Sequence, residues 1–197
     1  MLMNKNAIFI LIIFALLTGC NGTNENSIDK QNKVVVQSEV TIASYDKNQL
    51  VHDSDVIIEG RVIDKKVTED FEGFPATDFI ISVDKVYKGD PEKEVSVRTR
   101  GGETDKMIYH PDEDEIVSFE LKEKVTVFLT NEKGNRPDKD DFDYFVVGQF
   151  QGKFNEVNGK LINKKIDFDV NRFEKELKQI EILNKENKLD TLHKKVE

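Results

Sequence analysis

The side chains best suited to bind a ligand lie in one basic, glycine-containing stretch. Arg98 and Arg100 end an alternating segment, and Gly101 and Gly102 follow directly. Paired glycines let backbone N–H groups approach an anion closely, and arginines add charge-assisted hydrogen bonds. A nucleotide-binding loop would also need a Gly-Lys-Ser sequence and a following helix, and the sequence predicts neither. We expect Arg98, Arg100, Gly101 and Gly102 to contact any small ligand, although an ordinary turn or bulge also fits them.

Two acidic stretches are candidate cation sites. In the first, His110 precedes four carboxylates at positions 112–115, and imidazole and carboxylate are both metal ligands. In the second, Asp138, Asp140, Asp141 and Asp143 offer oxygen ligands but lack the glycine and the bidentate glutamate of a calcium-binding EF-hand loop. Solvated charged loops explain both stretches more simply, so we predict no metal and no cofactor.

The sequence contains no residues at the spacings that are typical of known catalytic sites. The three histidines, His52, His110 and His193, are far apart, and the sequence contains no Gly-x-Ser-x-Gly motif. The only cysteine is Cys20. We predict a non-catalytic protein, with an enzyme built on the acidic residues around His110 as an alternative.

Cys20 ends an apolar N-terminal run. One positive charge, Lys5, precedes eleven uncharged residues, Ala7–Leu17, which are too few to span a bilayer, since a spanning helix needs about 20. The sequence Leu17-Thr18-Gly19-Cys20 resembles the lipobox of bacterial lipoproteins. That resemblance implies a signal peptide at 1–19, a diacylglyceryl group (with palmitate as a typical acyl chain) on Cys20, and attachment to the extracytoplasmic face of the cell membrane. Two acyl chains suffice for stable anchoring.

Charge and composition limit the classes of partner that this protein can bind. The formal net charge is −9, which argues against nucleic acid and against a second, electrostatic attachment to anionic lipid. A single cysteine excludes an intramolecular disulfide. Residues 20–33 are polar and predict a flexible tether.

Residues 34–168 contain a succession of short strand-like segments separated by turn residues, with all four prolines between them. Val95, Val97 and Thr99 alternate with Ser96, Arg98 and Arg100, which predicts a strand with one solvated face. Gly60 predicts a bulge or bend inside a strand, and Asn158-Gly159 predicts a two-residue hairpin turn. The expected strands are 34–36 with 40–42, 55–65, 77–87, 94–99, 124–130, 144–147, 152–157 and 160–163, and a single helical turn is expected at 46–53.

The last segment, 169–197, lacks glycine and proline. Phe173, Leu177 and Ile180 fall on one helical face, with Asp169 or Asn171 as the N-cap. The chain is therefore predicted to be mainly β: a small OB-like antiparallel β-barrel with a C-terminal amphipathic helix, or alternatively a β-sandwich.

The strand pattern also resembles the netrin-like domains of the tissue inhibitors of metalloproteinases, and similar patterns occur in uncharacterised exported proteins of Gram-positive bacteria. Residues Ser54–Val62 and Phe79–Gly89 resemble their first two barrel strands, and Val95–Val97 and Val125–Leu129 would follow as later strands. The resemblance implies an OB-type fold. Those inhibitors depend on disulfides and a free N-terminal cysteine, neither of which this chain can supply, so no inhibitory residue is carried over.

The function expected from these features is a lipid-anchored extracytoplasmic binding or interaction module for an unknown protein or small ligand. Two alternatives stay open: a regulator resembling a protease inhibitor, and an enzyme with an acidic site around His110.

Overall fold

The computed structural model describes residues 33–38, 41–111 and 116–187, which belong to one compact unit, Asn32–Glu197. The predicted signal peptide, Cys20 and nearly all of the tether lie outside the described residues. So do the four carboxylates at 112–115 and the last ten residues of the expected helix.

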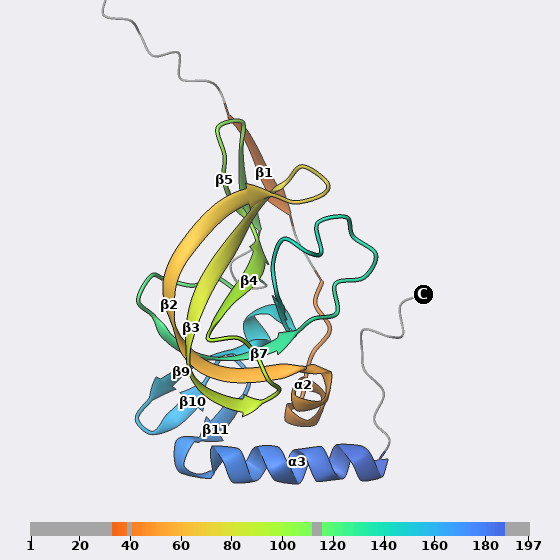
Figure 1. The fold of residues 1–197 in the computed structure, drawn as a ribbon, viewed down its shortest axis with the longest axis vertical. Coiled ribbons are helices and arrows are strands. Elements are labelled where there is room, and N and C mark those ends of the chain that lie inside the picture. The colour runs from red at the N-terminus through yellow and green to blue at the C-terminus, as the bar shows by residue number, and fades with distance from the viewer. Residues whose placement is uncertain (1–32, 39–40, 112–115, 188–197) are drawn as a thin grey trace, which may run out of the picture. The chain divides into compact units, whose positions relative to one another are not determined.

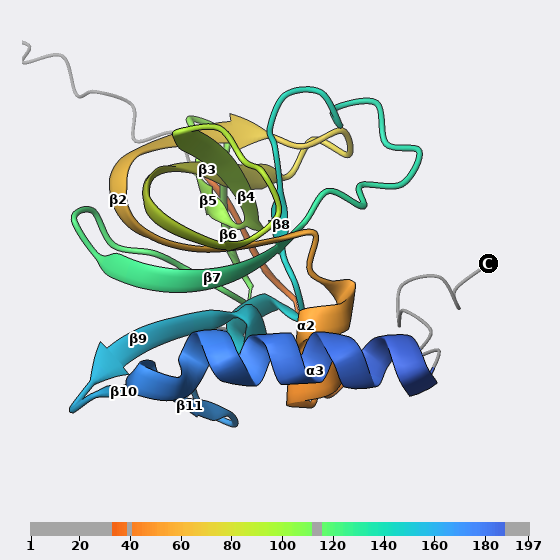
Figure 2. The ribbon, with the colours of Figure 1, turned by 60° about the horizontal axis from the view of Figure 1, so that its bottom comes forward.

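The main sheet is antiparallel and strongly curled (Figure 1, Figure 2). Its neighbouring strands run in the order β11-β10-β9-β7-β2-β3-β4, and β8 pairs with β7 at the side. The strands are β2 (Val56–Glu69), β3 (Pro75–Lys88), β4 (Glu94–Arg100), β7 (Lys124–Thr130), β8 (Phe145–Val146), β9 (Lys153–Val157), β10 (Lys160–Ile162) and β11 (Asp167–Asp169).

One short segment connects the two sides of the curl. Val97 of β4 forms a parallel bridge with Tyr144, and the next two residues form β8, which pairs with β7. The order around the ring is therefore β7-β2-β3-β4-β8, with β8 returning to β7. This arrangement confirms the mainly β, OB-like barrel with a C-terminal helix and favours it over the sandwich.

The barrel interior is apolar, as the strand alternation requires. At Gly60 the pairing of β2 with β3 shifts register, and an added Cβ would lie 2.5 Å from the Ser82 carbonyl oxygen. The expected irregularity at Gly60 is confirmed. The buried core residues of the barrel are Val56, Ile58, Val62, Phe79, Ile81, Val95, Val97, Val117, Phe119, Val125, Val127, Leu129 and Val146.

A second core lies between the barrel, the strands β9 to β11 and two helices, α2 (Lys47–Asp53) and α3 (Phe173–Asn187), which Figure 2 shows against the lower part of the sheet. Helix α2 lies where a helical turn was expected, at 46–53, and the Asp46 carboxylate caps it by accepting the Gln49 N–H. The central rings are Phe128, Phe154, Phe168 and Phe173, all at most 1% exposed.

The C-terminal helix buries the predicted face, Phe173, Leu177 and Ile180. The α-helix begins at Phe173 rather than at 169, although Asp169, one of the two expected N-caps, does cap the turn that leads into it. Asp167–Asp169 pair with β10 as β11, and a 3-10 turn, η3 (Val170–Arg172), capped by the Asp169 carboxylate, precedes the helix.

A small second sheet was not predicted as such. It joins β1 (Val34–Ser38), β6 (Met107–Pro111) and β5 (Gly102–Glu103), with β1 parallel to β6. Pro111 ends β6 and Pro75 begins β3, so these two prolines lie at strand ends rather than between strands. A strand's first residue tolerates proline because its N–H need not join the ladder. The predicted Asn158-Gly159 turn is confirmed: both residues have positive φ and join β9 to β10. A further 3-10 turn, η2 (Gln149–Gly152), follows β8.

Candidate functional site

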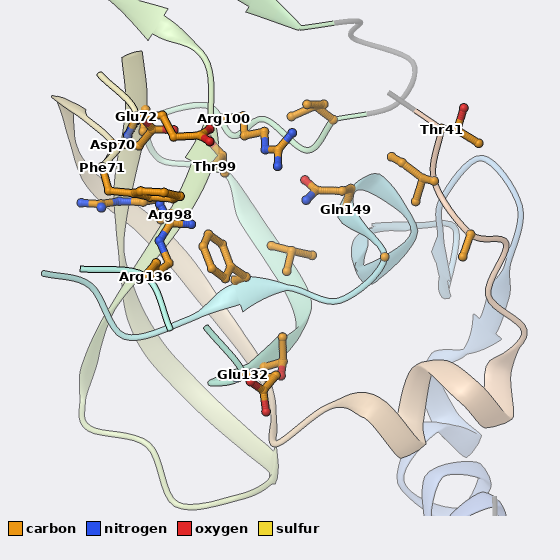
Figure 3. Close-up of a pocket in the computed structure, with 18 of the residues that line it drawn as sticks. Thr41, Asp70, Phe71, Glu72, Arg98, Thr99, Arg100, Glu132, Arg136 and Gln149 are labelled. Atoms are coloured by element: carbon orange, nitrogen blue, oxygen red, sulfur yellow. Dashed lines mark hydrogen bonds between the residues drawn. The ribbon is translucent and has the colours of Figure 1, made fainter. Parts of the chain in front are cut away.

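A cavity of about 620 Å³ lies where the connection between β2 and β3 approaches the connection between β7 and β8. The end of β4 forms one wall, and the residues after β8 and the segment 41–45 form others (Figure 3). Three arginines and three carboxylates line it together with apolar and aromatic side chains. Of the four residues expected to contact a ligand, Arg98 and Arg100 line this cavity.

Arg98 is held by a buried ionic network. Its Nε and Nη2 atoms donate to the two carboxylate oxygens of Asp78 at 2.6 and 2.7 Å, and its Nη1 donates to Asp138 at 2.8 Å. The side chain is only 3% exposed. Burial disfavours the charge, but the hydrogen bond to Asp78 and the negative charges of Asp78 and Asp138 together outweigh it and raise the pKa of Arg98. The expectation that Arg98 lies on a solvated face is therefore wrong, because the connection between β7 and β8 covers it.

Arg136 and an aromatic cluster complete the cover. Arg136 donates from Nε and Nη2 to Asp138, which lowers the pKa of that carboxyl through its side-chain hydrogen bond. The Arg98 guanidinium carbon lies 4.3 Å from the centre of the Phe142 ring, and that of Arg136 lies 4.8 Å from the Phe71 ring. Both distances suit cation–π contacts. Asp138, from the second acidic stretch, therefore neutralises arginines within the fold.

Arg100 differs from its two neighbouring arginines. Its side chain is exposed and lines the cavity. No residue in the described part of the chain forms a hydrogen bond or ion pair with its guanidinium. Figure 3 shows it pointing into the cavity toward Gln149, on the opposite wall. Arg100 is the cationic group of the wall that a ligand can engage.

The paired glycines have a conformational role. Gly101 has φ +97°, donates its N–H to the Pro75 carbonyl, and leaves only 2.8 Å between an added Cβ and Cδ of Pro111. Gly102 has φ +148°, and its added Cβ would lie 3.0 Å from Oγ1 of Thr77. Both glycines let the chain pass closely over its neighbours, and the described cavity wall includes neither.

The cavity is not electropositive. Asp70, Glu72 and Glu132 line it together with the three arginines, and Asp78 and Asp138 form ion pairs with Arg98. The Asp70 carboxylate accepts the N–H groups of Glu72 and Phe74 and so shapes the connecting loop. This balance disfavours a polyanionic ligand.

The sequence did not single out Phe71, Arg136, Phe142 or Gln149 as parts of a site. The only available signal was Phe142, an aromatic residue within a run of aspartates. Among the described residues, no group of three His, Cys, Asp or Glu side chains could hold a metal ion. His110 lies on β6, and the carboxylates expected beside it fall at 112–115, outside the described residues.

No protein-family model matches this chain, and no curated protein matches it significantly in sequence.

Within residues 33–38, 41–111 and 116–187, no helix is both long and apolar enough to cross a membrane.

Proposed function

We propose that this protein is a lipid-anchored extracytoplasmic binding module that takes its ligand in the cavity beside Arg100. The observation that carries the binding role is the exposed guanidinium of Arg100, which pairs with no residue in the described part of the chain, within a cavity of about 620 Å³. Ligand sites of about 300–1,000 Å³ combine apolar walls with a few convergent polar groups, and this cavity has that composition.

The position of the cavity supports the same proposal. In OB-type barrels, the loops after the first and fourth barrel strands flank the usual binding face. Here the corresponding connections are those between β2 and β3 and between β7 and β8, and both contribute to the cavity. This support is an analogy between folds, so the ligand must be argued from the site itself.

The ligand role is tested by photo-crosslinking in intact membranes. Benzoylphenylalanine replaces Phe71, which is 50% exposed at the cavity, and in a control replaces Ile182, which is 56% exposed on α3. We expect a specific adduct at position 71 only, and its loss in the variant Arg100→Ala but not in Arg172→Ala, an exposed arginine away from the cavity. The same adducts at both positions, or none under any growth condition, would count against the proposal.

The anchor is proposed from the resemblance of Leu17-Thr18-Gly19-Cys20 to a lipobox. Metabolic labelling with a palmitate analogue tests it. We expect labelling of the natural chain and none in Cys20→Ala, with release or mislocalisation of a folded protein. Labelling that persists in Cys20→Ala would refute the lipid site.

The two alternatives, a regulator resembling a protease inhibitor and an enzyme around His110, remain predictions from the sequence. No feature of the described residues favours either one over a binding module.

A further inference from the structure

The strands β4 and β8 separate at the cavity. The residue just before β8, Tyr144, forms a parallel bridge with Val97 of β4: it donates its N–H to the Ser96 carbonyl and accepts the N–H of Arg98, each at 3.0 Å. Beyond this point the chain follows β7 instead: Val146 pairs with Leu129, and Val147 donates to the Phe128 carbonyl. A gap therefore opens alongside the end of β4.

The direction of the β4 backbone groups follows from the bonds on either side. The Arg98 N–H points away from β3, toward Tyr144, whereas the Gly101 N–H points toward β3 and bonds Pro75. Because successive residues of a strand alternate in direction, the N–H and carbonyl of Arg100 and the carbonyl of Arg98 also point away from β3. No described residue hydrogen-bonds to these three groups. They form a short, unpaired strand edge at the wall of the cavity.

The strand edge and the exposed guanidinium belong to the same residue, Arg100. The guanidinium of Arg100 lines the cavity, so a ligand paired with the Arg100 backbone also comes within reach of its positive charge. On the other side of the gap, Phe145 and Gln149 offer an aromatic surface and an amide. Strand addition of this kind gains affinity from main-chain hydrogen bonds and selectivity from side-chain contacts.

We infer that the ligand of the proposed binding site is an extended peptide segment that adds as a strand to β4 at Arg98–Arg100 and places a carboxylate on the Arg100 guanidinium. The inference rests on the proposed function and specifies its ligand class. The carboxylate belongs either to an acidic side chain or to a peptide C-terminus. The binding step is non-covalent.

The probe is a fluorescein-labelled hexapeptide library, made once with a free C-terminal carboxylate and once as the carboxamide, with Glu or Gln fixed at each position in turn. Fluorescence anisotropy measures binding to the full-length protein in detergent. We expect the tightest peptides to carry a carboxylate, and the carboxamide and Gln arms identify which source is used. Arg100→Ala should weaken the binding of these peptides at least tenfold and remove the preference for a carboxylate. Arg100→Lys should keep part of that preference, and the control Arg172→Ala should bind the peptides as tightly as the natural chain does.

Two further measurements test strand addition. Saturating peptide slows hydrogen exchange of the Arg100 amide at least tenfold, and methylation of the peptide nitrogens that face β4 weakens binding at least tenfold. Peptides that bind with neither effect would overturn the inference. No peptide binding, together with a specific non-peptide adduct at position 71, would also overturn it while the proposed function stands. The absence of both peptide binding and an adduct would reject the two together.

Discussion

Removing the cation from the buried network around Arg98 provides the sharpest test of how the cavity is held. The substitution Arg98→Met leaves Asp138 with Arg136 but removes the only side chain in the described part of the chain that hydrogen-bonds Asp78. Asp78 is 7% exposed. Breaking a buried pair by removing one partner costs about 3–5 kcal/mol, so we expect a loss of that size in the free energy of unfolding at neutral pH.

The double variant Arg98→Met/Asp78→Leu separates pairing from packing. It removes both charges of the bidentate pair, and apolar replacement of a complete buried pair is often neutral, so we expect it to lie within about 2 kcal/mol of the natural protein. In Asp78→Leu alone, Arg98 keeps only Asp138 as a partner, and that carboxylate also binds Arg136. We expect this variant to lose about 3 kcal/mol of the free energy of unfolding. The double variant should therefore be more stable than Arg98→Met.

Urea unfolding followed by far-UV circular dichroism measures these differences, because the chain has no tryptophan. The matched control is Lys160→Met, which breaks an exposed pair with Asp167 at 2.9 Å and should leave the midpoint nearly unchanged. If the double variant loses the sum of the two single losses, Arg98 and Asp78 are not energetically coupled and the reasoning fails.

Three further predictions concern the frame of the site. Gly60→Ala should lower the free energy of unfolding by at least about 2 kcal/mol, because the added Cβ would clash with the backbone. The loss should exceed that of Gly159→Ala, where only the positive φ disfavours a side chain. Equal thermal unfolding temperatures of the two variants would contradict this prediction. Phe173→Ala, which removes a ring that is 1% exposed, should cost about 3–5 kcal/mol in urea unfolding, and a loss under about 1 kcal/mol would exclude the second core as described. Because its bond from Arg136 lowers the pKa of Asp138, this carboxylate stabilises the fold above its unfolded pKa, about 3.9, and that stability is lost as the pH falls through the lower folded value. Asp138→Asn should therefore be less stable than the natural protein at pH 7 and approach it in acid, whereas a constant difference across that range would refute the charge argument.

Patterns that depend on near neighbours in the sequence were predicted well. The alternation of Val95 and Val97 marked a buried strand face, the spacing of Phe173, Leu177 and Ile180 marked a helix face, and both are confirmed. These features follow from the periods of strands and helices alone.

Features that depend on distant segments were not predictable in the same way. Arg98 is covered by Asp138 and Phe142, some forty residues later, and no local pattern reveals that meeting. For the same reason β6 was missed, since it pairs with β1 across about seventy residues. The candidate site was therefore predicted in part, since Arg98 and Arg100 both line the cavity. Only the residues around them show that Arg98 has a structural role and that Arg100 is accessible to a ligand.

The way the barrel ring is completed has a consequence for the order of folding. β2, β3 and β4 pair with their neighbours along the chain. In contrast, β7 pairs with the distant β2, where Leu129 lies opposite Val56, and the ring is completed only when Tyr144 pairs with Val97. Contacts between distant residues carry the larger loop-closure entropy, so we expect the three-stranded meander to form before the ring is completed. Ile81→Val in β3 should then mainly slow folding, and Phe154→Leu in β9 should mainly speed unfolding. Stopped-flow kinetics with the opposite pattern would show that the barrel is completed first.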